Sequence, residues 1–356
     1  MKSGSSSRRW HLSSALCALP VAVVSVFRAV PAPWPAPVVQ LVAFTPWLVL
    51  PAGAALVLAL PARRPWAALP AGALLALQLL WLFPPDRVAE RFLARPADPS
   101  QGQEQGTGQD TGQRPSAELK VMTLNAWKGQ ADAAEVVRLV RENGVGLLAV
   151  QELSPALERR LDAEGLGALL PHRISRSRDG AGGGGVYSSR PLVPLDSVDG
   201  SAFHMPTVQL ELDAGGQPAS LTVTNVHTKA PVWGRAGQWR SELAALGRLA
   251  ARPGNVLMLG DFNATLDHAE FRQMLEGSAG AGTGGTGSGG PLVDAGAAAL
   301  ARLIPTWPMA GPPLPGVVID HIVTSPQVPS RGYSVLPVAG SDHAAVLATL
   351  SVPAED

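Results

Sequence analysis

The sequence has very little cysteine, since Cys17 is the only one among 356 residues. A single thiol excludes any disulfide within the chain, so cysteine usage indicates neither an oxidising nor a reducing compartment. Cys17 itself lies within an apolar stretch. A chain of this length is enough for one large domain with an appendage.

The chain also lacks a net charge: its formal charge is zero, because 28 Lys and Arg balance 28 Asp and Glu. The balance is uneven along the chain. Residues 1–117 carry 10 basic and 5 acidic side chains, a net of +5, whereas residues 118–356 carry 18 and 23, a net of −5. Tight binding of duplex DNA relies on many phosphate-facing cations, so nucleic acid is the less favoured partner of the acidic part. A local basic groove that binds DNA would still be compatible with the negative net charge of residues 118–356.

Charges are absent from the centres of three apolar stretches near the N-terminus, at residues 12–30, 38–60 and 66–83. A transmembrane helix needs about 20 mainly apolar residues. The sequence therefore predicts a membrane anchor over residues 1–95 with three transmembrane helices. Pro20 and Arg28 interrupt the first stretch, for which a cleaved signal peptide is the alternative. Without acidic, Lys or His residues at their centres, the stretches suggest no ion path.

Basic residues flank these stretches unevenly, which predicts an orientation. Lys2, Arg8 and Arg9 precede the first stretch, and Arg63 and Arg64 separate the second from the third. This pattern predicts a multi-pass protein of the cell membrane with a cytoplasmic N-terminus and an extracytoplasmic domain after the third helix. Arg87, Arg91 and Arg95 follow the third apolar stretch, on the predicted outer side, and they weaken the prediction of this orientation.

Residues 96–117 are rich in Gln, Gly and Thr and poor in apolar residues, which predicts a flexible linker. A linker of this length would hold the domain at residues 118–356 close to the bilayer. Membrane-borne substrates are then within its reach.

The domain is organised around Gly260-Asp261-Phe262-Asn263, which follows the apolar run Asn255–Leu259. The run predicts a buried strand. Asp261 and Asn263 are two residues apart, so their side chains lie on the same side of an extended chain. Gly260 permits close approach of the backbone to another group. Taken alone, the motif is more typical of a turn that ends a strand.

Comparable polar groups follow other apolar runs in a fixed order along the chain. They are Leu124-Asn125, Gln151-Glu152, Val226-His227, Ile319-Asp320-His321 and Ser341-Asp342-His343. Together with Asp261 and Asn263, this ordered set resembles the endonuclease/exonuclease/phosphatase superfamily, the metal-dependent phosphoesterases related to DNase I. The resemblance extends over roughly residues 119–350. It implies a four-layer α/β sandwich of two mixed sheets flanked by helices, with the site where strand ends of both sheets meet.

A metal site is predicted around Glu152, which follows the buried run Val145–Val150. An unpaired carboxylate is costly to bury, and a hard cation such as Mg²⁺ or Mn²⁺ would balance it. A Glu that starts a helix or forms a salt bridge is the alternative, and the resemblance favours the metal. Asp342 is a second candidate ligand. Some relatives have an acidic ligand where Trp127 stands, so no ligand is assigned there.

The resemblance also implies catalytic roles. Asp261 would orient or deprotonate the attacking water, and Asp320 would orient His343, which contacts the phosphoryl group or shares the base role. Asp261 and the Asp320–His343 pair remain alternative bases. The residues that would stabilise developing charge are Asn125, Asn263 and His227. No Glu follows Tyr187 at the place where DNase-type members pair one with the histidine corresponding to His227.

Four further side chains are candidates for substrate binding. Tyr187 would reach a phosphate oxygen, or it is a half-buried aromatic residue of a strand. Lys229, Arg235 and Arg240 lie close together in sequence and would bind a second phosphate, or they are solvated surface charges.

An N-terminal anchor, a short linker and this domain together resemble membrane-anchored members linked to teicoplanin resistance. That resemblance implies hydrolysis of a phosphate ester or anhydride at the outer membrane face, with undecaprenyl pyrophosphate or a related lipid pyrophosphate as substrate. An anchored extracellular nuclease or phosphodiesterase is the alternative. A binding module without enzymatic activity is disfavoured, because every polar position of the motif set is filled.

Overall fold

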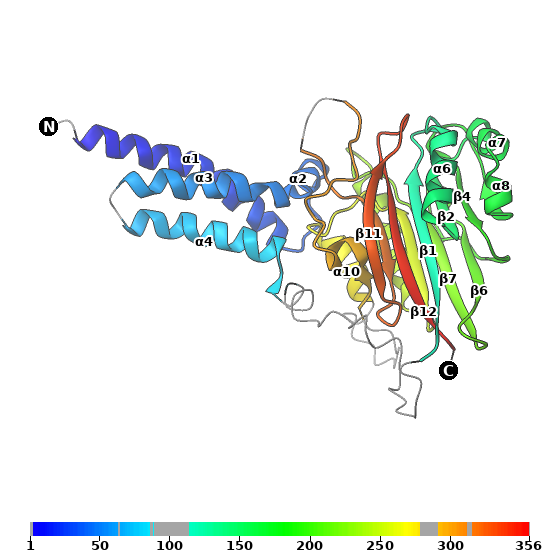
Figure 1. Cartoon of the computed structure of the whole chain (residues 1–356). Helices are drawn as coiled ribbons and strands as arrows, with labels where there is room; N and C mark the ends of the chain where they lie inside the picture. Colours follow the sequence, from blue (N-terminus) through cyan, green and yellow to red (C-terminus); the bar gives the residue numbers. More distant parts are fainter. Residues whose placement is uncertain are drawn as a thin grey trace.

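The computed structural model describes residues 3–62, 65–85, 88, 114–277, 291–311 and 315–355. Its larger part is a sandwich of two sheets, and a bundle of N-terminal helices extends from one end of that sandwich (Figure 1). The elements of the sandwich match the expected architecture of two mixed sheets flanked by helices.

The first sheet has six strands in the order β11-β12-β1-β2-β4-β3. β1 pairs with β2 in parallel, and the other neighbours are antiparallel, so the sheet is mixed. Its strands are β1 (Ser116–Asn125), β2 (Leu147–Gln151), β3 (His172–Arg176), β4 (Gly184–Ser188), β11 (Ser330–Pro337) and β12 (Ala344–Pro353).

The second sheet has the order β5-β6-β7-β8-β10-β9. It is mixed as well, because β7 and β8 are parallel. Its strands are β5 (Leu192–Leu195), β6 (Thr207–Asp213), β7 (Pro218–His227), β8 (Val256–Asp261), β9 (Val293–Asp294) and β10 (Asp320–Thr324).

The central strands of both sheets are apolar almost throughout because both of their faces are buried. In β2, Leu147 and Ala149 join the core between the two sheets, whereas Leu148 and Val150 face the helices outside. Alternate side chains of an extended chain point to opposite faces, so a central strand such as β2 contributes to two cores.

Helices cover the outer face of each sheet. The first sheet is covered by α6 (Ala133–Asn143), α7 (Pro155–Ala163) and α8 (Leu166–Leu169), and the second by α9 (Ala236–Ala250) and α10 (Ala269–Glu276). A short helix, α11 (Ala295–Ala298), follows β9. Both ends of α6 have capping residues: Asp132 accepts a hydrogen bond from the Glu135 amide at 2.9 Å, and Gly144 ends the helix with φ of 62°.

The N-terminal helices differ from the prediction of three membrane-spanning helices. Only α1 (Ser3–Ala29) contains a described stretch long and apolar enough to cross a membrane, at Arg9–Ala29. The predicted second helix is broken and bent by 60° between α2 (Ala36–Val42) and the segment Thr45–Ala59. That segment comprises η1 (Thr45–Leu48) and α3 (Val49–Ala59), and η2 (Leu60–Ala62) follows it. In α4 (Pro65–Leu82) the apolar part, Ala68–Leu82, is shorter than a span.

Proline accounts for the break in the predicted second helix. Pro46 lies in the first turn of η1, where its missing amide removes a helical hydrogen bond, and it disfavours helical geometry at Thr45. The Thr45 hydroxyl instead donates to the Val42 carbonyl at 2.7 Å. The prediction missed the break because it weighed only the apolar character of the segment.

The helical part packs directly on the sandwich. The carboxylate of Asp267 is buried between Arg28 of α1 and Arg302, with an N–O distance of 2.6 Å to each. His268 Nε2 lies 2.9 Å from the Val39 carbonyl, and the Val39 side chain joins the core that includes Trp239. Most of the predicted linker, with Lys2, Arg63 and Arg64, lies outside the described residues.

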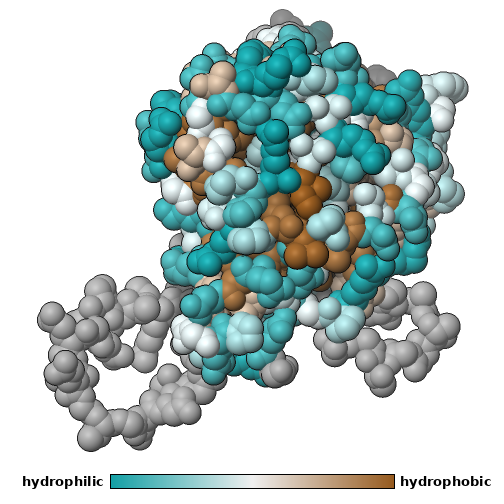
Figure 2. Space-filling model, turned by 90° about the vertical axis from the view of Figure 1, so that its right-hand side faces the viewer, coloured by the Kyte–Doolittle hydropathy of each residue, from teal (hydrophilic) through white to brown (hydrophobic). Residues whose placement is uncertain are grey.

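The two ends of the molecule differ in surface character. Large exposed hydrophobic side chains are concentrated on the N-terminal helices, for example Leu16 and Leu19 of α1 and Leu50 and Val57 of α3. Figure 2 shows the end of the sandwich away from these helices, which is mostly hydrophilic with a small hydrophobic area at its centre.

Candidate active site

Five predicted polar residues lie where strands of the two sheets end. Asn125 is the last residue of β1, and Glu152 directly follows β2. In the second sheet His227 ends β7 and pairs with Asp261 at the end of β8. Asp320 begins β10 opposite Asp261. The strand register therefore brings both sheets' polar groups to one edge of the sandwich.

A buried polar network holds the sheets together beneath this edge. The Gln151 amide donates to Thr123 Oγ1 at 2.9 Å within the first sheet and to Asn225 Oδ1 of the second at 2.6 Å. Gly260 is required for this approach: with φ of 145°, a Cβ atom there would lie 2.0 Å from the Val226 carbonyl oxygen. The network fixes the separation of the strand ends that carry the site.

Asp261 is the centre of the hydrogen bonds at the site, and it is 2% exposed. Asn125 Nδ2 donates to its carboxylate at 3.0 Å, and the backbone amide and side chain of Asn263 donate at 2.8 and 3.2 Å. Burial raises the pKa of Asp261 to about 7; the charge of His343 opposes this shift, and the charge of Asp320 adds to it. In this geometry Asn125 and Asn263 hold Asp261, and their predicted role towards the substrate stays a prediction.

His343 is bound to Asp320, as the resemblance implied. Its Nδ1 lies 2.9 Å from Asp320 Oδ2, and its Nε2 lies 3.9 Å from Asp261 Oδ2. Burial lowers the pKa of His343, but the charge and hydrogen bond of Asp320 outweigh burial and raise it to about 9. His343 is therefore an imidazolium at neutral pH, with Nε2 directed at the carboxylate of Asp261.

His227 lacks the carboxylate partner that DNase-type members provide. Its ring stacks on Phe203 with centroids 4.3 Å apart, and its Nδ1 has no hydrogen-bond partner among the described residues. Nε2 lies 3.7 Å from Glu152 and 3.9 Å from Asp261. Burial lowers the pKa of His227 to about 3, with the charges of His343 and Lys229 acting in the same direction. His227 is therefore neutral.

Glu152 has the properties expected of a metal ligand. Its backbone is left-handed with φ of 54°, an unusual conformation for this residue type that directs the side chain into the site. The carboxylate accepts one short hydrogen bond, from the Lys128 amide at 2.7 Å. Within the described chain, His227 is the one residue able to carry a positive charge that lies within 4 Å of the Glu152 carboxylate, and His227 is neutral. A largely buried carboxylate without a cationic partner fits a divalent cation.

A second group of potential ligands lies beside Glu152. Oxygen or nitrogen atoms of Asp261, Asp320 and His343 lie within 4.8 Å of one another. His343 already binds Asp320 through Nδ1, whereas Glu152 has no charged cationic partner within the described residues, so we favour Glu152. Asp342 lies next to this group: its buried Oδ1 accepts no hydrogen bond and lies 4.0 Å from His343 Nε2, and its Oδ2 accepts from Trp307 Nε1 at 3.2 Å.

The four candidates for substrate binding divide into two pairs. Lys229 lines the cavity at the site, with its Nζ 4.3 Å above the ring centre of Phe203, and Arg235 lines the same cavity. Arg240 lies elsewhere, in an ion pair with Glu270 at 2.9 Å. Tyr187 is buried among the side chains between the first sheet and its helices. The structure thus brings Lys229 and Arg235 to the site but not Arg240 or Tyr187, because the last two face packed interiors.

The site opens into a cavity of about 520 Å³ that two distant parts of the chain enclose. One wall belongs to the sandwich and includes the catalytic candidates, Phe203 and Val232. The other wall belongs to the N-terminal part and includes Gln40, Ala43 and Phe44. Ala43 and Phe44 pack against Trp307, Val317 and Ile319.

The sequence reasoning missed this second wall. It treated residues 38–60 as one membrane span, so Phe44 had no expected function. The break at Pro46 was the available signal, since a proline inside an apolar segment often ends a helix. For Phe203 the sequence offered no signal, because its loop carries no motif.

Comparisons with known proteins complete the description. The sequence profile described as the Endonuclease/Exonuclease/phosphatase family matches residues 122–343. No curated protein matches the chain.

Among solved structures, the Danio rerio TDP2 complex with a single-strand DNA product is 15% identical, with 66% of this chain and 99% of that chain covered and a TM-score of 0.48. An endonuclease/exonuclease/phosphatase from Beutenbergia cavernae is 19% identical, with 68% and 72% covered and a TM-score of 0.45. A family protein from Bacteroides thetaiotaomicron is 12% identical, with 67% and 96% covered and a TM-score of 0.41.

Proposed function

The chain belongs to the endonuclease/exonuclease/phosphatase family, and on that premise we propose that it is a membrane-associated phosphoesterase acting on a lipid-linked phosphate ester or anhydride. Family members are hydrolases of phosphodiester bonds and typically depend on a divalent metal. A lipid pyrophosphate such as undecaprenyl pyrophosphate is the substrate we favour. The domain would act at the outer face of the membrane.

One observation carries the lipid assignment. Phe44 and Ala43, which follow α2, line the same cavity as Asp261 and His343. α2 lies between the membrane-capable helix α1 and α3, whose surface is rich in exposed apolar side chains. A substrate phosphate at Asp261 would therefore lie next to the segment nearest to the bilayer. Trp233, 83% exposed beside the cavity residue Val232, has the amphipathic character typical of a membrane interface.

The chain's own residues supply acid–base chemistry at the phosphate. Asp261, with a pKa of about 7, is suited to accept a proton from the attacking water. His343, with a pKa of about 9, carries a positive charge that Asp320 holds in place. Of the two alternative bases, these protonation states favour Asp261 and give His343 the role of stabilising negative charge. Asn125 and Asn263 orient Asp261, and Lys229 adds a cation at the cavity wall.

Glu152 would hold the metal, for which Mg²⁺ is the first choice and Mn²⁺ the second. When bound, such a cation polarises phosphoryl oxygens and offsets their charge. Asp342 remains a further candidate ligand because its Oδ1 accepts no hydrogen bond within the described chain.

A hydrolysis assay on full-length protein in vesicles tests the proposal, with released phosphate measured for the pyrophosphate and cleavage products separated by chromatography for the two diester substrates. Undecaprenyl pyrophosphate, a phosphodiester lipid and duplex DNA are offered separately, each with Mg²⁺ or with EDTA. We expect Mg²⁺-dependent release from the lipid pyrophosphate. Preference for DNA would replace the proposal by the anchored nuclease.

The role of the N-terminal wall is tested with Phe44→Ala. We expect kcat/KM for the lipid substrate to fall by about tenfold, since loss of a large apolar contact costs about that factor, and kcat/KM for water-soluble p-nitrophenyl phosphate to change little. Leu50→Ala, an equally apolar change on the exposed surface of α3, is the matched control. An equal loss on both substrates in Phe44→Ala would argue against a lipid-binding wall.

A further inference from the structure

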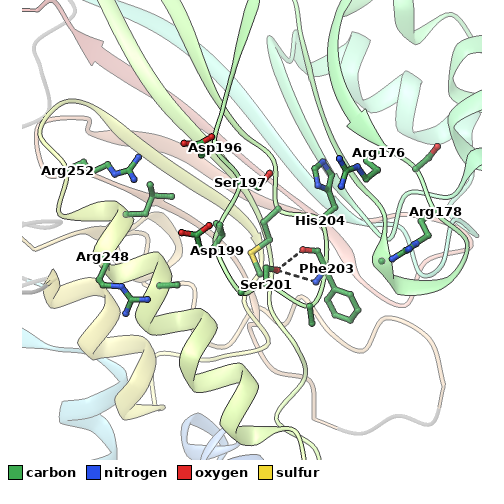
Figure 3. Close-up of a pocket in the computed structure, with 18 residues that line it drawn as sticks. Arg176, Arg178, Asp196, Ser197, Asp199, Ser201, Phe203, His204, Arg248 and Arg252 are labelled. Carbon is green, nitrogen blue, oxygen red and sulfur yellow. Dashed lines mark hydrogen bonds between the residues drawn. The ribbon is translucent and has the colours of Figure 1, made fainter.

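A second cavity lies beside the active site and is not used by the chemistry described above. It has a volume of about 700 Å³ and lies between the end of β3, the loop that joins β5 to β6, and the last turns of α9 (Figure 3). Phe203 lines both cavities, and Ala181 of the first is followed in sequence by Gly182 of the second. The two spaces are therefore neighbours that one aromatic side chain separates.

Four arginines surround this cavity. Figure 3 shows Arg176 and Arg178 on one side and Arg248 and Arg252 on the other. Within the described ranges none of the four guanidinium groups has an ion pair or a hydrogen bond to protein. By contrast, Arg173 on the same strand as Arg176 is paired with Asp162 at 2.8 Å.

The lining carries a net positive charge within an acidic domain. Asp196 and Asp199 also line the cavity, so four cations face two anions, a net of +2. Burial lowers the pKa of His204, and Arg176 lowers it further, so His204 adds no charge at neutral pH. Residues 118–356 as a whole have a net charge of −5. The lining is thus a local concentration of positive charge in an acidic domain, and such a concentration attracts anions.

The cavity is held in shape by its own hydrogen bonds. The buried carboxylate of Glu242 accepts from the Ala202 amide at 2.8 Å and from the Lys229 amide at 2.6 Å. The Gln238 side chain donates to the Gly200 carbonyl at 2.7 Å, and the His204 amide donates to the Gly182 carbonyl at 3.1 Å. Glu242 thereby ties the loop of the arginine cavity to Lys229 of the active site. A preformed cavity costs little to order when a ligand enters.

We infer that this arginine cavity is a subsite for an anionic group of the substrate's headgroup. The group is a second phosphate, bound beyond Phe203 while the reacting phosphate lies at Asp261. The N-terminal wall with Phe44 and the arginine cavity are formed by different elements, so an amphiphile would place its tail at one and its charged headgroup at the other. This assignment rests on the proposed function. Guanidinium groups are well suited to phosphate, because their planar donors match its oxygens.

Direct binding tests the subsite independently of activity. Inorganic triphosphate is titrated calorimetrically into the full-length protein in detergent with EDTA, which removes divalent metal from the active site. We expect Arg248→Ala/Arg252→Ala and Arg176→Ala/Arg178→Ala each to weaken binding by at least about tenfold, because charge-assisted hydrogen bonds are lost. The matched control is Arg141→Ala/Arg159→Ala, which removes the same charge from α6 and α7 and should bind as the wild type does.

Kinetics distinguish a headgroup subsite from a site for free anions. Vesicles that contain undecaprenyl phosphate and vesicles that contain undecaprenyl pyrophosphate offer the same lipid tail without and with a second phosphate. We expect the double variants to raise KM for the second lipid by about tenfold with little change in kcat, and to leave the first lipid unaffected.

Four results would overturn the inference. Equal loss of triphosphate binding in the control would indicate a general charge effect, and unchanged binding in both cavity variants would remove the site. Arginine-dependent binding of a single-stranded oligonucleotide more tightly than triphosphate would assign the cavity to nucleic acid. If the wild type cleaves no lipid while triphosphate binding depends on the four arginines, the proposed function fails and the cavity is a site for free anions.

Discussion

At the scale of single residues, Glu152 differs from Asp320 and Asp261 because it has no charged cationic partner and only one short hydrogen bond among the described residues. Asp320 has His343 and Asp261 has two asparagines, whereas Glu152 accepts one short backbone hydrogen bond. We therefore expect Glu152→Gln to lose activity through loss of metal affinity and to recover partly when Mg²⁺ is raised. Activity is measured against Mg²⁺ concentration, with the exposed Glu164→Gln as control. Normal activity of Glu152→Gln at low Mg²⁺ would show that another residue holds the metal.

Asp261 and His343 face each other across 3.9 Å, so we expect them to act on the same step. Asp261→Ala and His343→Ala should each reduce kcat by about 10²–10⁴-fold. The double variant should be little slower than the slower single variant, since residues that act as a unit give non-additive losses. Multiplicative losses would instead indicate independent roles. Circular dichroism of each variant separates loss of chemistry from loss of fold.

The pKa values of the same two residues predict a bell-shaped pH profile. Asp261 must be deprotonated to accept a proton, so kcat/KM rises as pH passes about 7. His343 must be protonated to stabilise negative charge, so kcat/KM falls as pH passes about 9. Asp320→Asn removes the charge that raises the pKa of His343, and it should therefore move the alkaline limb to lower pH. An alkaline limb that stays in place in Asp320→Asn would contradict the assignment to His343.

At the scale of elements, the contact of α1 with the sandwich depends on one buried carboxylate. Burial raises the pKa of Asp267, but Arg302 and Arg28 outweigh it and lower the pKa below the usual 3.8. The ion pairs therefore contribute fully above about pH 3.8, and the contribution is lost as pH falls through the lowered pKa. Asp267→Asn leaves two arginines without a counter-charge, which should destabilise the packing of α1 by about 3–5 kcal/mol.

Hydrogen exchange at residues 28–44 in detergent measures this effect, with faster exchange expected in Asp267→Asn. Asp162→Asn removes an exposed partner of Arg173 and should change stability by only about 0–1 kcal/mol. Identical exchange in the wild type and Asp267→Asn would show that the apolar contacts of Val39 and Phe44 suffice to hold the helices.

The elements of the sandwich could be predicted where the hydrophobic pattern and the residues at the element ends indicate the same structure. α6 follows from an amphipathic run between Asp132 and Gly144, and β8 from an apolar run that ends in Gly260-Asp261. The site followed as well, because strand ends that carry Asn125, Glu152 and Asp261 meet at one edge.

The rest could not be read from the sequence, because it depends on contacts between distant residues. Arg28 binds Asp267 across 239 positions, and Tyr187 faces a packed interior near the end of β4, whereas β4 begins at the edge that carries the site. The bend before Pro46 places Phe44 at the active site only because Trp307 and Val317 offer it an apolar surface. Periodicity describes the face of an element but not its distant partner.

At the scale of the whole molecule, the expected orientation in the membrane remains to be tested. The basic residues before the first apolar stretch predict a cytoplasmic N-terminus, and an uneven number of crossings places the sandwich outside. α1 alone is long and apolar enough for one crossing. A reporter enzyme that is active only outside the cytoplasm, fused to the C-terminus, should be active. Activity of a cytoplasm-only reporter at the same position would reverse the orientation and exclude substrates of the outer face.

The wall that α2 and Phe44 contribute to the active site affects what a truncated form of the protein can show. A soluble fragment that begins at β1 would contain Asp261, His343 and Glu152, yet its cavity would lack Gln40, Ala43 and Phe44 and lie open to water. Such a fragment would report the chemistry of the family but not the preference of this enzyme among substrates. For the same reason, exchanging the N-terminal helices between relatives would transfer part of the selectivity with them. The N-terminal helices and the sandwich are therefore one functional unit, and we expect substitutions at Phe44 and at Trp307 to depend on each other.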